Sequence, residues 1–132
     1  MKTDIHQFIF GNITIKLSMP DAANIRNDYE TTHNNTTPFP FWAKAWPASI
    51  GLCNFLAENN KLIADKKVVE IAAGLGLPSL YAANVASHVI CSDYLQQPMD
   101  FVNKSIEQNA LKNITTTIIN WNHLPDDFSA DV

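Results

Sequence analysis

Short apolar runs alternate with helical patterns from residue 66 onward, and this alternation limits the chain to a small set of folds. Strands are expected at Lys67–Ile71, His88–Ser92 and Thr115–Asn120, and helices at Pro78–Ala86 and Pro98–Leu111. Continuous apolar strands joined by helices of this length are typical of a parallel sheet that helices cover on both faces. We therefore predict an α/β fold with a doubly wound parallel sheet and right-handed crossovers.

The N-terminal part of the chain has a different pattern. Apolar residues alternate with polar or smaller ones over residues 8–17, around Gly11-Asn12. A period of two on both sides of such a dipeptide predicts a β-hairpin. Ile25 and Tyr29 are four residues apart, which allows a short helix, and the polar residues 30–37 are expected to form a loop.

A further helix is expected from Pro47 to Glu58. Proline suits the first turn, because it lacks an N–H that the first turn leaves unpaired, and the asparagines after Glu58 close the helix. At helical spacing its apolar residues form a stripe that we expect to be buried, namely Trp46, Ile50, Cys53 and Ala57.

Composition argues against several kinds of partner. The 132 residues carry a net charge of −4, whereas a nucleic-acid binder needs a basic face to neutralise phosphates. No segment approaches the roughly 20 apolar residues that span a membrane. The amino terminus has no apolar export segment, and Cys53 and Cys91 fit apolar patterns as buried free thiols, so we expect a cytoplasmic protein. The histidines show no metal-ligand spacing.

Two acidic residues stand at the ends of the first two parallel strands. Glu70 precedes the small-residue turn 72–76, and a carboxylate before a glycine turn at a strand's carboxyl end is typical of nucleoside-cofactor sites. Asp93 follows the next strand, where one carboxylate matches the two hydroxyl donors of a ribose. The alternatives are a surface acid for Glu70 and an N-cap for Asp93. Gly74 and Gly76 would shape a tight turn in either case.

Three motifs follow one another in residues 38–132. Trp46-Pro47 opens the helix before the first parallel strand, with Phe41-Trp42 just ahead of it. Residues 69–78 read Val-Glu-Ile-Ala-Ala-Gly-Leu-Gly-Leu-Pro, and Asn120-Trp121-Asn122 follows the third strand. In this order the motifs resemble the class I, seven-stranded S-adenosylmethionine-dependent methyltransferases, in their protein-lysine methyltransferase-like and nicotinamide N-methyltransferase-like branch.

The resemblance implies a Rossmann-like fold, of which this chain holds the first three to four strands. It divides the chain into an N-terminal β-hairpin and linker, residues 1–37, and an S-adenosylmethionine-binding domain, residues 38–132. The chain stops at Asp131-Val132, where the family opens its fourth strand, so the domain is expected to be incomplete at its C-terminal end. The family's substrate motif lies beyond that point, which leaves the catalytic residues unassigned and predicts little transferase activity for this piece alone. Because an open strand edge invites pairing, a homodimer or pairing with a missing C-terminal portion is expected.

The resemblance also implies a cofactor, S-adenosyl-L-methionine, and roles for single residues. Ala72 stands where the family has its first motif glycine, and its methyl group is expected to narrow the backbone's approach to the cofactor. The small turn residues would lie near the methionyl part, with the charge of Glu70 near the ammonium and the sulfonium. The ribose would bind Asp93. The adenine would lie at Asn120 and Trp121, although an ordinary strand-end Asn-Trp pair has the same pattern. Tyr94 would stack on the adenine or stand exposed in a loop.

Trp42 and Trp46 have two interpretations. An aromatic face within about 6 Å of a cation contributes roughly 0.5–2 kcal/mol, which suits a sulfonium or a substrate ammonium. Tryptophans beside a helix are, however, more often part of a core. We predict that Trp46 serves mainly in packing, with one edge on the cofactor, and that Trp42 lies at the mouth of a substrate pocket.

The function favoured by these patterns is methyl transfer to a nitrogen, in a protein lysine or a small amine. One alternative is an NAD-dependent oxidoreductase, but the Gly-x-Gly-x-x-Gly spacing is absent and Pro78 removes an N–H that a pyrophosphate would use. A second alternative is a non-catalytic cofactor-binding or regulatory remnant of the same fold.

Overall fold

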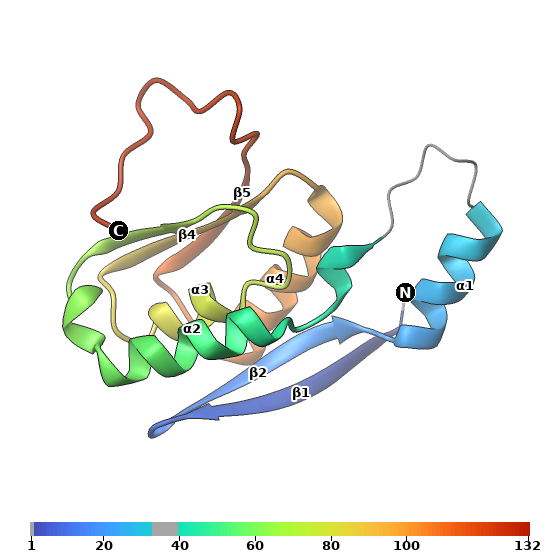
Figure 1. Cartoon of the computed structure of the whole chain (residues 1–132), viewed down its shortest axis with the longest axis horizontal. Coiled ribbons are helices and arrows are strands. Elements are labelled where there is room, and N and C mark those ends of the chain that lie inside the picture. Colours follow the sequence, from blue (N-terminus) through green and yellow to red (C-terminus); the bar gives the residue numbers. More distant parts are fainter. Residues whose placement is uncertain (1, 33–39) are drawn as a thin grey trace.

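The computed structural model describes residues 2–32 and 40–132 (Figure 1). The strands are β1 (Thr3–Phe10), β2 (Ile13–Pro20), β3 (Lys67–Glu70), β4 (His88–Asp93) and β5 (Ile114–Ile118). The α-helices are α1 (Ala22–Thr32), α2 (Pro47–Glu58), α3 (Leu77–Ala82) and α4 (Gln96–Gln108), with 3-10 turns at Phe41–Ala43 and Asn60–Leu62. Within the described ranges, no helix is long and apolar enough to cross a membrane.

The predicted β-hairpin is confirmed. β1 and β2 pair antiparallel, with Phe10 opposite Ile13 across the two-residue turn. Gly11 has a φ of +61°, the left-handed conformation that such a turn requires. On the inner side, Phe10 contacts Tyr81 edge-on at 5.9 Å between ring centroids, so the hairpin belongs to the main core.

Ser105 of α4 and Asn109, which caps the C-terminus of α4, fix the free edge of β2. Asn109 accepts a hydrogen bond from the Lys16 N–H at 2.9 Å and donates one to the Lys16 carbonyl at 2.7 Å. Ser105 accepts from the Ser18 N–H at 2.8 Å. These bonds satisfy backbone groups that an edge strand leaves open, and they make the hairpin a brace against α4.

Part of the N-terminal prediction is corrected by α1. The short helix is confirmed, but it continues to Thr32, so the predicted loop 30–37 is wrong at its first three residues. Positions 33–37 of that loop, and the proposed domain boundary between 37 and 38, lie outside the described residues.

The helix α2 has the predicted bounds, Pro47 to Glu58. Its predicted buried stripe is only partly right. Cys53 is fully buried and Ile50 is partly buried, but Trp46 is 42% exposed. Trp46 precedes the first helical turn in an extended conformation, which turns it away from the stripe.

The predicted parallel sheet is confirmed, with strand order β3-β4-β5. The observed strands begin or end within two residues of the predicted ones, and α3 ends four residues before its predicted end at Ala86. In the order β3-β4-β5 each strand lies beside the next one along the chain. Right-handed crossovers in a single direction place both connecting helices on the same face of the sheet, and Figure 1 shows the helices α2, α3 and α4 on one side of the strands.

Helices cover one face of the sheet (Figure 1), and the predicted cover of the second face is only partial within the described residues. Residues on the helix-bearing face, such as Val89 and Cys91, are fully buried. Their neighbours Val69 and Ile90, which point to the other face, keep part of their surface exposed. The hairpin packs on the far side of the helices, so the layers run sheet, helices, hairpin (Figure 1).

Residues 131 and 132 lie along the outer edge of β3. The Asp131 N–H donates to the Lys67 carbonyl at 2.9 Å, and the Val69 N–H donates to the Val132 carbonyl at 3.0 Å. This is the position at which the resemblance expects the fourth strand to open.

Candidate functional site

A hollow of about 280 Å³ lies at the carboxyl ends of β3 and β4. The two acids that end these strands, Glu70 and Asp93, both line it. The turn 72–76 forms the same wall, and the segment 41–46 forms a second wall, which meets the turn where Trp42 lies beside Gly74. Leu17 of the hairpin also lines the hollow. The sequence therefore brings its two predicted ligand acids to one cavity, at the place where open α/β sheets bind ligands.

Glu70 is partly buried and tied to the start of α3. Its Oε1 accepts one hydrogen bond from the Ser79 hydroxyl at 2.6 Å and another from the Ser79 N–H at 3.2 Å. Burial raises the pKa of this carboxyl to about 7, the Ser79 bonds lower it, and the charge of Asp93 raises it further. The burial and the raised pKa of Glu70 therefore favour its interpretation as a ligand group over that as an ordinary surface acid.

Asp93 links the two strand ends through its carboxylate. Oδ2 accepts from the Gly74 N–H at 2.9 Å, and Oδ1 accepts from the Leu95 N–H at 3.1 Å. The second bond caps the turn before α4, so the N-cap alternative describes part of its role. Because a carboxylate has about four acceptor positions, two of them are left for a diol in the hollow.

The backbone of the turn has three left-handed residues. The φ angles are +55° for Ala72, +57° for Gly74 and +72° for Gly76. A Cβ at Gly76 would lie 2.9 Å from the Cys91 Sγ and 3.0 Å from the Val102 Cγ2, so only glycine fits there. Ala72 takes a left-handed conformation with a side chain, at a cost of about 1–2 kcal/mol.

Three of the five amides of the turn 72–76 are already used within the protein. Ala73 donates to the Ser92 carbonyl, Gly74 to Asp93, and Gly76 to the Ala73 carbonyl, each at 2.9 Å. A phosphate-binding turn instead points free N–H groups at the anion. The two carboxylates accept hydrogen bonds and carry negative charge, so they suit a ligand with a cation and a diol better than an anionic pyrophosphate.

The two tryptophans both line the hollow, but they differ in burial. Trp42 is the better buried, since it contacts Phe101 at 5.7 Å between centroids and packs on the core. Trp46 is the exposed one, so the prediction that it serves mainly in packing is wrong. Its Nε1 donates to the Phe41 carbonyl at 2.8 Å, and the Lys44 ammonium lies 4.6 Å from its ring centroid.

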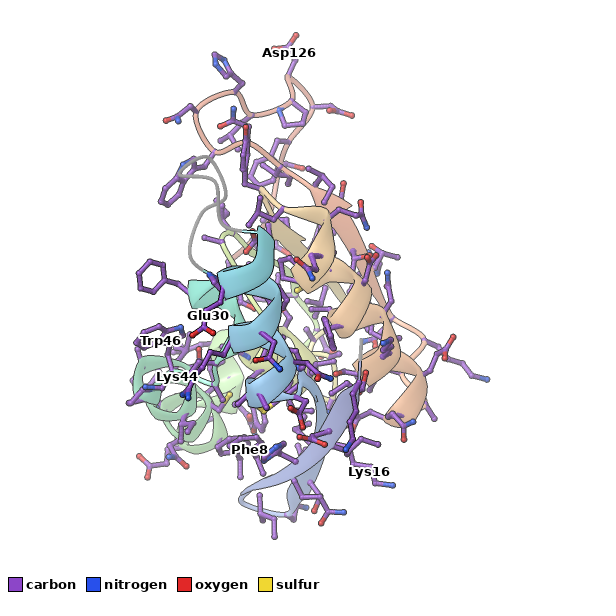
Figure 2. The ribbon with its side chains drawn as sticks, turned by 90° about the vertical axis from the view of Figure 1, so that its right-hand side faces the viewer. Phe8, Lys16, Glu30, Lys44, Trp46 and Asp126 are labelled. Carbon is purple, nitrogen blue, oxygen red and sulfur yellow. The ribbon has the colours of Figure 1, made fainter. Side chains whose placement is uncertain are left out.

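Lys44 and Trp46 also border a second, larger hollow. It has a volume of about 870 Å³ and lies between α1, the open end of the hairpin and the segment 40–46. Figure 2 shows Lys44 and Trp46 beside Glu30 of α1, and these three side chains line the hollow. Lys44 and Trp46 thus line both hollows.

The residues predicted to bind the adenine do not line the first hollow, which holds Glu70 and Asp93. Trp121 and Tyr94 are each 64% exposed, and neither they nor Asn120 line it. The Asn120 Oδ1 accepts from the Asn122 N–H at 3.0 Å, which closes a turn. The strand end itself lies near the site, because the Ile119 N–H donates to the Asp93 carbonyl at 3.0 Å.

Among the site residues that sequence reasoning missed, three stand out by their contacts. Ser79 is fully buried and binds Glu70, Lys44 covers Trp46, and Leu17 comes from the hairpin. The position of Ser79, two residues into the helix after the turn, was a usable signal, since serine there can reach back to a strand-end acid. Among the described residues, no group of three or more histidines, cysteines, aspartates and glutamates could hold a metal.

The fold is that of the class I methyltransferases. A Thermus thermophilus 16S rRNA N2 G1207 methyltransferase, solved with AdoMet and guanosine, superposes with a TM-score of 0.60 at 20% identity over 83% of this chain and 26% of that one. Residues 31–132 match the lysine methyltransferase family, so the chain belongs to that family.

Two relatives show how much of a family member is present. The histone-arginine methyltransferase METTL23 of Xenopus laevis is 31% identical over 84 residues, 62% of this chain and 36% of that protein. The protein-lysine methyltransferase METTL21E of Bos taurus is 42% identical over 55 residues, 40% of this chain and 19% of that protein. The chain thus spans about a third or less of these relatives. Neither an oxidoreductase nor a non-catalytic remnant is supported by these matches.

Proposed function

We propose that this chain is the cofactor-binding part of an S-adenosylmethionine-dependent protein-lysine methyltransferase. One observation carries the proposal: Glu70 and Asp93, at the ends of adjacent parallel strands, line one hollow with the glycine turn between them. The family match and the AdoMet-bound structural neighbour support it. The cofactor supplies an activated methyl group on a sulfonium; the protein supplies its position.

The residues of the hollow fit the parts of this cofactor. Glu70 offers negative charge to the ammonium and the sulfonium, and the free acceptor positions of Asp93 suit the ribose hydroxyls. The small residues of the turn keep the backbone side of the hollow open. Asn120 and Trp121 remain our proposal for the adenine, supported by the bond that joins the end of β5 to Asp93.

The acceptor we favour is a protein lysine, because the family and several relatives carry that name. A lysine must lose its proton before it can accept a methyl group, and no residue of this chain is assigned that task. Trp42 and Trp46 line the same hollow as the acids, where an aromatic face suits a cationic side chain. An arginine or a small amine is the outcome that an acceptor screen would have to exclude.

Further protein is proposed to complete the domain. The second face of the sheet keeps part of Val69 and Ile90 exposed, and residues 131–132 reach only the outer edge of β3. Pairing with a further C-terminal segment, or with a second copy, would cover both. A cytoplasmic location also remains our proposal, supported by the two buried free thiols.

Calorimetry with S-adenosylhomocysteine tests the proposed function directly. We expect binding by the 132-residue chain, no binding of NAD, and on the order of tenfold weaker binding by Asp93→Asn, which loses the charge that orders the ribose. Asp100→Asn on the exposed side of α4 is the matched control and should bind as the unaltered chain does. A folded chain that gives no heat with S-adenosylhomocysteine would contradict the proposal.

A further inference from the structure

Ser79 holds the cofactor-facing acid with both of its donors. The residue is fully buried, in the first turn of α3, and its hydroxyl and its N–H both donate to Glu70 Oε1. Both bonds fall on the same oxygen. Oε2 of this carboxylate is therefore left for a ligand in the hollow.

The surroundings of Glu70 otherwise oppose its negative charge. Asp93 on β4 is a like charge, and the Cys91 and Cys53 thiols, from β4 and α2, are buried neutral groups beside it. Lys44 is the cation of the same hollow, but its ammonium lies on the exposed ring of Trp46. The donors of Ser79 are thus the groups in direct contact that favour the carboxylate form.

We propose that Ser79 is a positioning residue for cofactor binding: its hydroxyl fixes the Glu70 carboxylate and keeps it charged toward the hollow. This inference rests on the proposed function, because it gives the charge of Glu70 a cationic ligand. Ser79 itself does not line the hollow, so its effect passes entirely through Glu70.

Removing the hydroxyl should produce a loss of affinity that depends on pH. The pKa of Glu70 is already raised to about 7, and without the Ser79 hydroxyl it rises further. At pH 6.5 a smaller fraction of Ser79→Ala is then ionised, and we expect it to bind S-adenosylhomocysteine on the order of tenfold more weakly than the unaltered chain. At pH 9 both carboxyls are charged, and the two affinities should agree within about twofold.

The experiment is calorimetry of the full chain between pH 6 and pH 9, with two reference variants. Ser79→Thr keeps a hydroxyl and should recover the pH profile of the unaltered chain. Ser105→Ala removes an equally buried serine hydroxyl, on α4, and should leave the profile unchanged.

The outcomes separate this inference from the proposed function. If the unaltered chain binds but Ser79→Ala binds equally well at every pH, or loses the same factor at every pH, the positioning role is wrong and the proposed function stands. If the unaltered, folded chain binds at no pH, the proposed function itself is wrong.

Discussion

The two walls of the candidate cofactor hollow are built in opposite ways. The wall at the strand ends consists of backbone in left-handed conformations and of acids held by N–H and O–H donors. The wall at residues 41–46 combines the partly buried Trp42 with exposed side chains, among them Trp46 with the Lys44 ammonium over its ring. The first wall fixes charge in place, whereas side chains of the second can move without breaking the fold. We expect mutations to separate the two walls sharply.

The largest effect is expected at Gly76. Gly76→Ala places a Cβ against Cys91 and Val102 and forces a left-handed φ on alanine. Together these effects should lower the free energy of unfolding by about 3 kcal/mol. Urea denaturation measures it. Gly51→Ala is the matched control, because its Cβ meets nothing within 4 Å and it lies in α2; it should raise stability by about 0.5–1 kcal/mol. If Gly76→Ala and Gly51→Ala changed the free energy of unfolding equally, the first wall could not be rigid.

A comparable effect of opposite sign is expected at Glu70. Since burial raises its pKa from 4.5 to about 7, folding takes up a proton between these values, and stability falls as the pH rises through them. Glu70→Gln removes this cost, so the free energy of unfolding at pH 8 should rise by up to about 3 kcal/mol. At pH 4 the carboxyl is protonated in both states, and the difference should vanish.

Denaturation at pH 4 and pH 8 checks this sign. Glu58→Gln, at an exposed position at the end of α2, is the control and should change stability by less than about 0.5 kcal/mol at either pH. A Glu70→Gln protein that is less stable than the unaltered chain at pH 8 would show that the carboxylate supports the fold rather than the ligand.

The smallest expected effects compare two residues of the second wall, Trp46 and Trp42. Trp46→Ala should cost less than about 1 kcal/mol, because its ring is exposed and its contact with Lys44 is a surface cation–π pair. Trp42→Ala should cost about 2 kcal/mol, since its ring packs on Phe101 and the core. Thermal denaturation of the two variants gives the comparison, and the reverse order would restore the sequence-based assignment of Trp46 to packing.

The sequence predicted the features that depend on backbone pattern. Strand and helix periodicity located the parallel strands, and the position of each acid at a strand end was enough to bring Glu70 and Asp93 together. Prediction from the sequence failed where residues distant in the chain determine the exposure or the partner of a side chain. The exposure of Trp46 follows from an extended residue before α2, and the partner of Glu70 is a serine nine positions on, which no motif singled out.

The partial cover of the second face of the sheet has a different cause. Two faces were expected because helices alternate with strands, but cover depends on strand order, which periodicity does not contain. In the order β3-β4-β5 the crossovers run in one direction, so one face alone receives helices from this segment.

The two buried cysteines can report local opening of the protein. Burial raises the pKa of the Cys53 thiol to about 12 and that of Cys91 even further, so neither is reactive while it stays enclosed. Cys91 lies beneath the Gly76 turn, and Cys53 lies on the helix that continues from the aromatic segment. The alkylation rate of each cysteine therefore measures how often the structure opens around that residue. Comparing the two rates with and without a ligand would show whether the ligand reduces opening around both cysteines or around only one.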